Sequence, residues 1–198
     1  MTEWWTYRLA SFLMFSPQTY WRLVARHNAA WWPAQALAVL AAGALPWLLR
    51  SPRAGAHRVA LVLLAGAWAW VGWSFQWRLY AEIFLGARWV AAACALQAVL
   101  LLAAAGCRPS ADRAAPAAGA ACWTLLLAAL LYPLLAPLTG HPWSEAEVFG
   151  FMPEPTALAT LGVLAGLRRW PSWARWALAI LPVLSLLLGA ATRWLIRQ

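Results

Sequence analysis

The chain has 198 residues, of which 64% are hydrophobic and only 11% are charged. A soluble domain has about 25% charged residues. This chain has too few charged side chains to cover a water-exposed surface, so we expect lipid to form much of its surroundings. The net charge of +9 does not indicate a nucleic-acid partner, because the Arg residues cluster at the ends of apolar segments, where they anchor helices beside anionic membrane lipids.

Residues 1–31 are too polar to cross a bilayer. Ser16 followed by Pro17 is a typical helix start, with Ser as the N-cap and Pro in the first helical position. We expect residues 1–31 to form an interfacial amphipathic segment, or alternatively a lid over the bundle. Residues 32–198 are expected to form a single transmembrane helical-bundle domain.

Six apolar segments make up that domain, and most approach the length of about 20 residues that a membrane-spanning helix needs. They cover residues 33–49, 59–77, 89–106, 121–138, 156–167 and 174–191. We therefore expect an all-α fold, a polytopic bundle of about six transmembrane helices in a bacterial inner (plasma) membrane. Gln35 and Gln97 lie inside the first and third segments, and a buried amide in lipid usually bonds to a neighbouring helix.

The distribution of Arg gives little guidance on orientation, because eight Arg lie on one side of the predicted topology and seven on the other. The connection that precedes the fifth segment has no Arg and contains Glu145, Glu147 and Glu154. We place this connection outside, which makes both termini periplasmic.

The fifth segment carries the strongest local signal for a site. Its 12 residues, 156–167, form about 18 Å of helix, which is too short to cross about 30 Å of hydrocarbon. Pro153 and Pro155 flank Glu154 and disfavour one continuous helix. We expect a broken or re-entrant span with irregular backbone near Val148–Pro155, buried in protein or lining a wet cavity. Glu154 would then belong to an outer-side acidic site; the alternative is a tilted helix with Glu154 as a cap on its rim.

A second polar cluster contains Arg78, Tyr80 and Glu82. Arg78 and Glu82 are four residues apart, so they can pair on a helical turn. The connection after the second segment and the connection after the fourth lie on the same side of the membrane in this topology. Their acids and one His could therefore converge. The residues concerned are Glu82, His141, Glu145, Glu147 and Glu154. Such groups serve as proton carriers or cation ligands, but their spacing matches no metal motif, and we predict no metal and no cofactor.

Three stretches of the chain resemble a family of small polytopic bacterial membrane proteins of unknown function. They are EWWTYRLASFLMFSPQTYWRL at 3–23, WSFQWRLYAEI at 73–83 and FGFMPEPTALATLG at 149–162. The residues in the shared stretches are Tyr20, Trp21, Arg22, Phe149, Gly150, Pro153, Pro155 and Thr156, and Glu154 keeps the acid that the family has there, often Asp. Members are sometimes labelled permeases, so the resemblance implies transport and supplies no mechanism.

We therefore predict a small permease that works through the acidic site around Glu154 and Glu82. The alternative is a non-transporting accessory or scaffold subunit that packs against a membrane partner, because 198 residues are few for an alternating-access carrier unless it forms a homo-oligomer. An enzyme is less favoured, since the chain has no nucleophile elbow, HExxH, P-loop or dinucleotide fingerprint, and we predict no catalytic residue.

Overall fold

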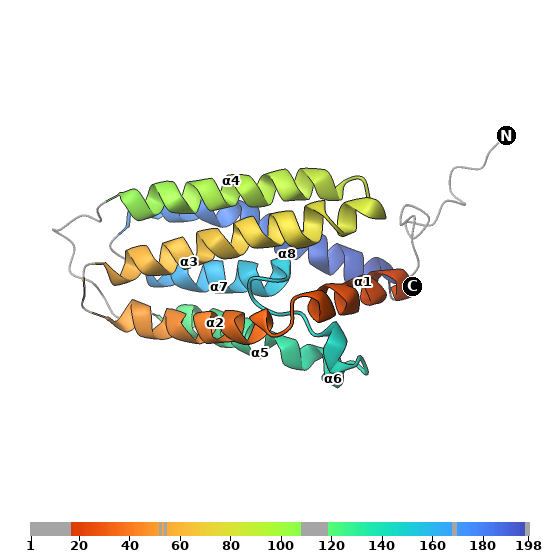
Figure 1. The fold of residues 1–198 in the computed structure, drawn as a ribbon. Helices are drawn as coiled ribbons and strands as arrows, with labels where there is room; N and C mark the ends of the chain where they lie inside the picture. Colours follow the sequence, from red (N-terminus) through yellow and green to blue (C-terminus); the bar gives the residue numbers. More distant parts are fainter. Residues whose placement is uncertain (1–16, 52, 54, 108–118, 168–169, 197–198) are drawn as a thin grey trace.

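The computed structural model describes residues 17–51, 53, 55–107, 119–167 and 170–196, and no β-strand occurs among them. Within these residues six helices run side by side as an elongated bundle (Figure 1): α2 (Ala34–Arg50), α3 (Ala56–Trp70), α4 (Ala87–Gly106), α5 (Ala120–Leu131), α7 (Pro153–Gly166) and α8 (Ser172–Ile196). Each predicted segment overlaps one of these helices, and the all-α prediction is confirmed. Residues 1–16 of the predicted N-terminal segment lie outside the described residues.

Helix α7 is the centre of the bundle. It is apolar on all sides, and ten of its 14 residues are buried between α3, α5 and α8, as expected for a helix without a polar face. The Trp68 side chain of α3 donates its indole N–H to Thr160 Oγ1 of α7 at 2.9 Å, and both side chains are buried. The buried position of α7 fixes where its first turn, which contains Glu154, can lie.

Two buried amides tie helices together, as the sequence predicts. Gln97 of α4 donates to the carbonyl oxygen of Leu178 in α8 at 3.0 Å. Gln35 of α2 donates to the carbonyl oxygen of Asn28 at 2.7 Å, across the bend to the preceding helix. Each bond gives the buried amide nitrogen a hydrogen-bond acceptor on a neighbouring segment.

Four helical stretches in the described residues are long and apolar enough to cross a membrane: Ala56–Glu82, Ala87–Gly106, Ala120–Leu138 and Ser172–Trp194. A fifth is obtained if α2 and the helix before it, bent by 91°, count as one broken span. With its 14 residues, α7 reaches only about 21 Å. Length and composition thus support four or five crossings, fewer than the six predicted. The helix that is too short is α7, which corresponds to the segment that the sequence already indicates is too short to span the membrane.

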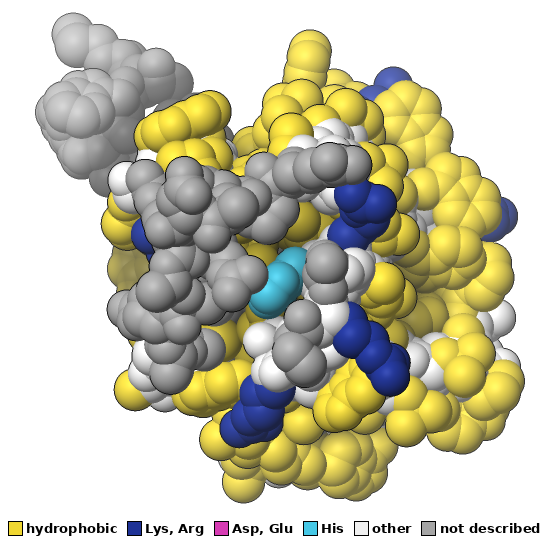
Figure 2. Space-filling view, turned by 90° about the vertical axis from the view of Figure 1, so that its left-hand side faces the viewer, with side chains coloured by type: hydrophobic (Ala, Val, Ile, Leu, Met, Phe, Trp, Pro, Cys, Tyr) yellow, Lys and Arg dark blue, Asp and Glu magenta, His cyan; other side chains and the backbone are white. Residues whose placement is uncertain are grey.

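The end of the bundle where α7 finishes is rich in Arg. Figure 2 looks onto this end and shows dark blue Arg side chains around it and apolar side chains on the flanks. Arg58 of α3 donates to the carbonyl oxygen of Ala105 in α4 at 2.9 Å, and the Arg50 guanidinium lies 4.1 Å from the ring centre of Trp123. These contacts hold the cations at the ends of apolar helices, where the sequence predicts that they serve as anchors.

Helix α1 (Pro17–Ala30) covers the opposite end of the bundle, where α7 begins (Figure 1). Its residues Tyr20, Leu23 and Val24 are buried in one cluster with Phe75 and Met152. The lid that the sequence leaves as an alternative for residues 1–31 stays a prediction, as does their interfacial placement.

Candidate functional site

The backbone that leads into α7 is irregular and buried. Residues 146–152 are non-helical, and every one of them is buried, which agrees with the irregular backbone predicted near Val148–Pro155. Helix α7 begins at Pro153, three residues earlier than predicted. The reason is that Pro is favourable in the first helical position, and Pro155 lies in the first turn, where no N–H is needed.

Thr156 holds this irregular backbone in place. Its hydroxyl accepts a hydrogen bond from the Gly150 N–H and donates one to the carbonyl oxygen of Met152, both at 2.8 Å. Gly150 has φ +73°, a left-handed conformation that Gly adopts without steric cost. The predicted structural motif of Gly150, Pro153, Pro155 and Thr156 therefore forms one turn that carries the chain into α7.

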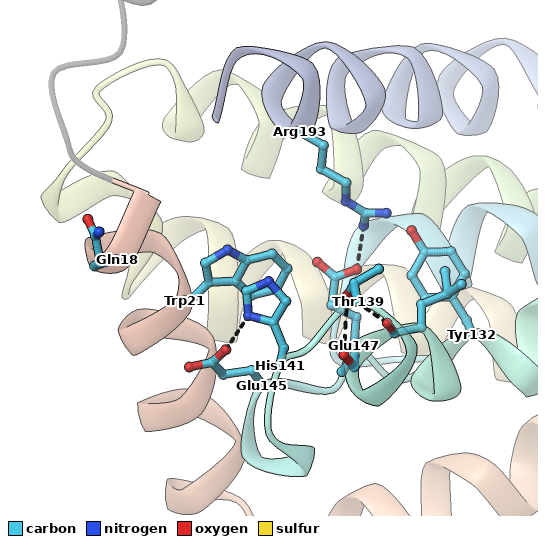
Figure 3. A pocket seen from close by; sticks show the side chains of 10 residues that line it. Gln18, Trp21, Tyr132, Thr139, His141, Glu145, Glu147 and Arg193 are labelled. Carbon is cyan, nitrogen blue, oxygen red and sulfur yellow. Dashed lines mark hydrogen bonds and ion pairs between the residues drawn. The ribbon is translucent and has the colours of Figure 1, made fainter. Parts of the chain in front are cut away.

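Four side chains from four elements meet beside this turn. Arg193 of α8 donates to Glu147 Oε2, and its Nη2 lies 3.7 Å from Glu154 Oε1. The Tyr20 hydroxyl of α1 donates to Glu147 Oε1 at 3.2 Å. Figure 3 shows Arg193 reaching from α8 toward Glu147, which lies on the loop before α7. We call Tyr20, Glu147, Glu154 and Arg193 the Glu–Arg cluster.

The Glu–Arg cluster has more acid than base. Glu147 is 5% exposed and Glu154 is 6% exposed, and buried carboxylates are costly unless they are paired. One guanidinium compensates one carboxylate, so the cluster is electrically neutral when the two acids share one proton. Burial, together with the nearby Glu154 charge, raises the pKa of Glu147, which lies outside the helices long enough to cross a membrane.

Two pockets reach the Glu–Arg cluster, and Arg193 lines both. The larger has a volume of about 520 Å³ and is bordered by Trp21, Tyr132 and Glu147 (Figure 3). The smaller has a volume of about 220 Å³ and is bordered by Gln76 and Glu154. Arg193 thus borders both cavities, and Glu147 lines the larger while Glu154 lines the smaller.

His141 and Glu145 lie at the larger pocket but outside the Glu–Arg cluster. His141 Nδ1 is 2.7 Å from a carboxylate oxygen of Glu145. The His141 ring packs against Trp21 of α1 with 4.1 Å between ring centres, as Figure 3 shows. Of the acids predicted to converge on Glu154, only Glu147 comes close to it. Glu145 is instead paired with His141.

Glu82 and Arg78 do not join the site, and their predicted ion pair does not form. Glu82 instead pairs with Arg26 of α1 at 3.2 Å, and both side chains are 59% exposed. The Arg78 guanidinium lies 5.2 Å from the ring centre of Trp73. The reason is local: a π-helix over Val71–Trp77 and a 3₁₀ turn over Tyr80–Glu82 replace the α-helical spacing that a pair four residues apart requires.

Tyr80 does reach the site, from the 3₁₀ turn. It is 8% exposed, lines the smaller pocket and stacks on Phe75 with 5.7 Å between ring centres. The π-helix also turns Gln76 into this pocket, where the side chain is 3% exposed. π-Helical turns are rare and often occur at functional sites, but their position cannot be read from hydropathy.

Arg193 is the main residue that the sequence does not single out. It lies near the end of the last helix and resembles an ordinary interfacial anchor. Tyr20 belongs to the stretches shared with the resembling family, but nothing local predicts its bond to Glu147. The ring centre of Tyr132 is 5.3 Å from the Arg193 guanidinium. The sequence does not single out this residue either, because it lies within an apolar segment.

The described residues contain no group of three or more His, Cys, Asp or Glu side chains that could hold a metal ion. The Glu–Arg cluster itself contains one carboxylate pair, one guanidinium and a phenol hydroxyl. Such a set can bind a cation, exchange a proton or hold a polar solute by hydrogen bonds.

Comparison with known proteins gives one family and no characterised relative. No curated protein and no solved structure matches the chain. One family model matches residues 17–197, nearly the whole described part, and the recognition from the shared stretches is confirmed. The chain belongs to the family of unknown function DUF6064.

Proposed function

We propose that this protein is a small multi-pass permease of a bacterial inner membrane, with the Glu–Arg cluster as its solute-binding site. One observation carries the proposal: the buried acids Glu147 and Glu154 and the half-buried Arg193 lie between two pockets, beside the irregular backbone that leads into the central helix. Discontinuous helices with irregular backbone at a cavity build substrate sites in transporters.

The energetics favour a functional reason for the cluster. Ionisable groups buried in a membrane bundle are costly, and a bundle rich in Ala and Leu could pack there without them. A neutral pair would need one acid and one base, whereas this site has two acids. The second carboxylate is what a bound cation or an exchangeable proton would neutralise.

Flux through reconstituted protein tests the proposal. Purified full-length protein in liposomes is screened with Na⁺, K⁺, protons and small amines, and flux above that of protein-free liposomes is expected for at least one of them. Glu154→Gln should reduce this flux at least about tenfold, because it removes the buried charge and keeps the side-chain shape. Glu82→Gln is the matched control, since it removes an acid that lies on the surface.

Two results would refute the permease. One is a lack of flux for every solute tested with monodisperse, folded protein. The other is flux that Glu154→Gln leaves unchanged, because the cluster would then play no part in the movement of solute.

A second candidate function is that of an accessory subunit packed against a membrane enzyme. Helix α8 favours it: only 17% of its apolar stretch is buried, and Trp173, Trp176 and Leu187 are exposed. This face could contact either lipid or a partner helix. Detergent extraction that yields a partner in fixed stoichiometry, lost on Trp176→Ala, would support the accessory role.

A further inference from the structure

The smaller pocket has hydrogen-bond acceptors that lack donors. Glu154 Oε2 and Gln76 Oε1 are buried, and neither has a hydrogen-bond partner among the described residues. Both side chains line this pocket, and both are more than nine-tenths buried. A buried acceptor without a donor is destabilising, and more so when it is charged, so an occupant of this pocket is expected to donate hydrogen bonds.

The charge of the surroundings specifies a cation. The titratable groups that face Glu154 are Tyr20 from α1, Tyr80 from one 3₁₀ turn, Tyr132 from the turn after α5, Glu147 from the loop and Arg193 from α8. With both carboxylates ionised these groups sum to one negative charge. An occupant with one positive charge therefore neutralises the site and can donate to the free acceptors.

The remaining walls of the pocket are aromatic and aliphatic. Phe75, Tyr80 and Phe84 line it from one direction and Leu188 of α8 from another. Aromatic faces attract cations, and apolar walls accept hydrocarbon. The volume of about 220 Å³ lies below the range of about 300–1,000 Å³ for drug-sized ligands. The walls thus fit a small molecule with one charged end and one apolar end.

We propose that the smaller pocket binds a small protonated amine with an apolar substituent, whose N–H groups donate to Glu154 Oε2 and Gln76 Oε1. This inference rests on the proposed permease function for its biological meaning, since it names the class of solute. In the state in which Glu147 and Glu154 hold one proton between them, the amine takes the place of that proton. Each binding event then releases about one proton, and affinity weakens as the pH falls.

Calorimetric titration of the purified full-length protein in detergent tests the proposal. The probes are phenethylammonium, its N,N,N-trimethyl analogue and the neutral 2-phenylethanol. Phenethylammonium is expected to bind, and the other two at least about tenfold more weakly, because one lacks N–H donors and the other lacks the charge. Titration in buffers of different ionisation enthalpy should report the released proton.

Variants localise the binding. Glu154→Gln should weaken phenethylammonium at least about tenfold, and Glu82→Gln, on the surface, should leave the affinity unchanged. If Glu154→Gln does not give folded protein, Gln76→Leu takes its place, since it removes one acceptor and keeps the charges. This variant should also weaken phenethylammonium. Absence of amine binding, equal binding of 2-phenylethanol, or unchanged affinity in the variant that folds overturns the proposal.

The two proposals fail in different ways. Amine binding in detergent without amine flux in liposomes would retain the binding site and refute the permease. Flux of another solute, with no amine binding, would retain the permease and refute the amine site.

Discussion

The Glu154 carboxylate packs directly on Gly189 of α8. A methyl group built on Gly189 would overlap this carboxylate, and Gly189 itself is buried at the smaller pocket. Glycine there allows the backbone of α8 to approach the buried acid. The contact explains how an acid at the start of α7 can reach Arg193, one turn further along α8.

Substitution of Gly189 by Ala should therefore damage the site. We expect Gly189→Ala to displace the carboxylate and to destabilise the protein by about 1–3 kcal/mol, the usual cost of overpacking. Thermal unfolding in detergent measures the loss, seen as a lower midpoint.

Gly43→Ala in α2 is the control for this substitution. A methyl group at Gly43 meets no atom within 4 Å, and Ala is the better helix former by about 1 kcal/mol, so its midpoint should stay equal or rise. Equal midpoints for Gly189→Ala and Gly43→Ala would contradict the packing described for Glu154.

At the scale of elements, the turn before α7 depends on one hydroxyl. Thr156 is 0% exposed and supplies both an acceptor for Gly150 and a donor for Met152. If the hydroxyl is lost, the Gly150 N–H is left buried without a partner. The irregular backbone of residues 146–152, and with it the position of Glu147, therefore rests on this side chain.

Thr156→Val keeps the shape and removes the hydroxyl. We expect a loss of about 1–3 kcal/mol, the cost of a buried unsatisfied donor, and faster proteolysis of the loop before α7. Thr156→Ser keeps the hydroxyl and should behave like the unmodified protein in both measurements. A Val variant as stable as the Ser variant would show that the two bonds are not needed.

At the scale of the whole molecule, the orientation in the membrane can be read from cysteine labelling. Cys107 is exposed and directly follows α4, two residues after Ala105, which accepts the bond from Arg58 at the Arg-rich end of the bundle; Cys94 and Cys122 are buried. The predicted topology places this end inside. A membrane-impermeant maleimide should therefore label the protein in inverted vesicles and not in spheroplasts.

Cys107→Ser provides the control, because it should abolish labelling in both preparations. Labelling of the unmodified protein in spheroplasts would reverse the topology and place the Glu–Arg cluster near the cytoplasmic side.

Local properties of the sequence determined that the chain forms apolar helices and that irregular backbone precedes the short helix α7. Apolar runs of sufficient length predict the helices. The Pro-Glu-Pro stretch predicts irregular backbone up to Pro155, and the structure confirms it for residues 148–152 only, because α7 already begins at Pro153. These predictions depend only on neighbours in the chain. The buried amides Gln35 and Gln97 were predictable for the same reason, since a polar group in an apolar run must find a partner.

Only the tertiary structure decided which charges meet. Arg193 lies 39 residues after Glu154 in the sequence, and its contact depends on how α8 is rotated against α7. Segments rich in Ala and Leu have little polar asymmetry, so their sequence does not fix that rotation.

The bend between α1 and α2 brings Tyr20 to Glu147. The π-helix turns Gln76 inward while Glu82 stays on the surface. Each of these placements arises from packing between distant segments, which hydropathy and spacing along the chain do not record.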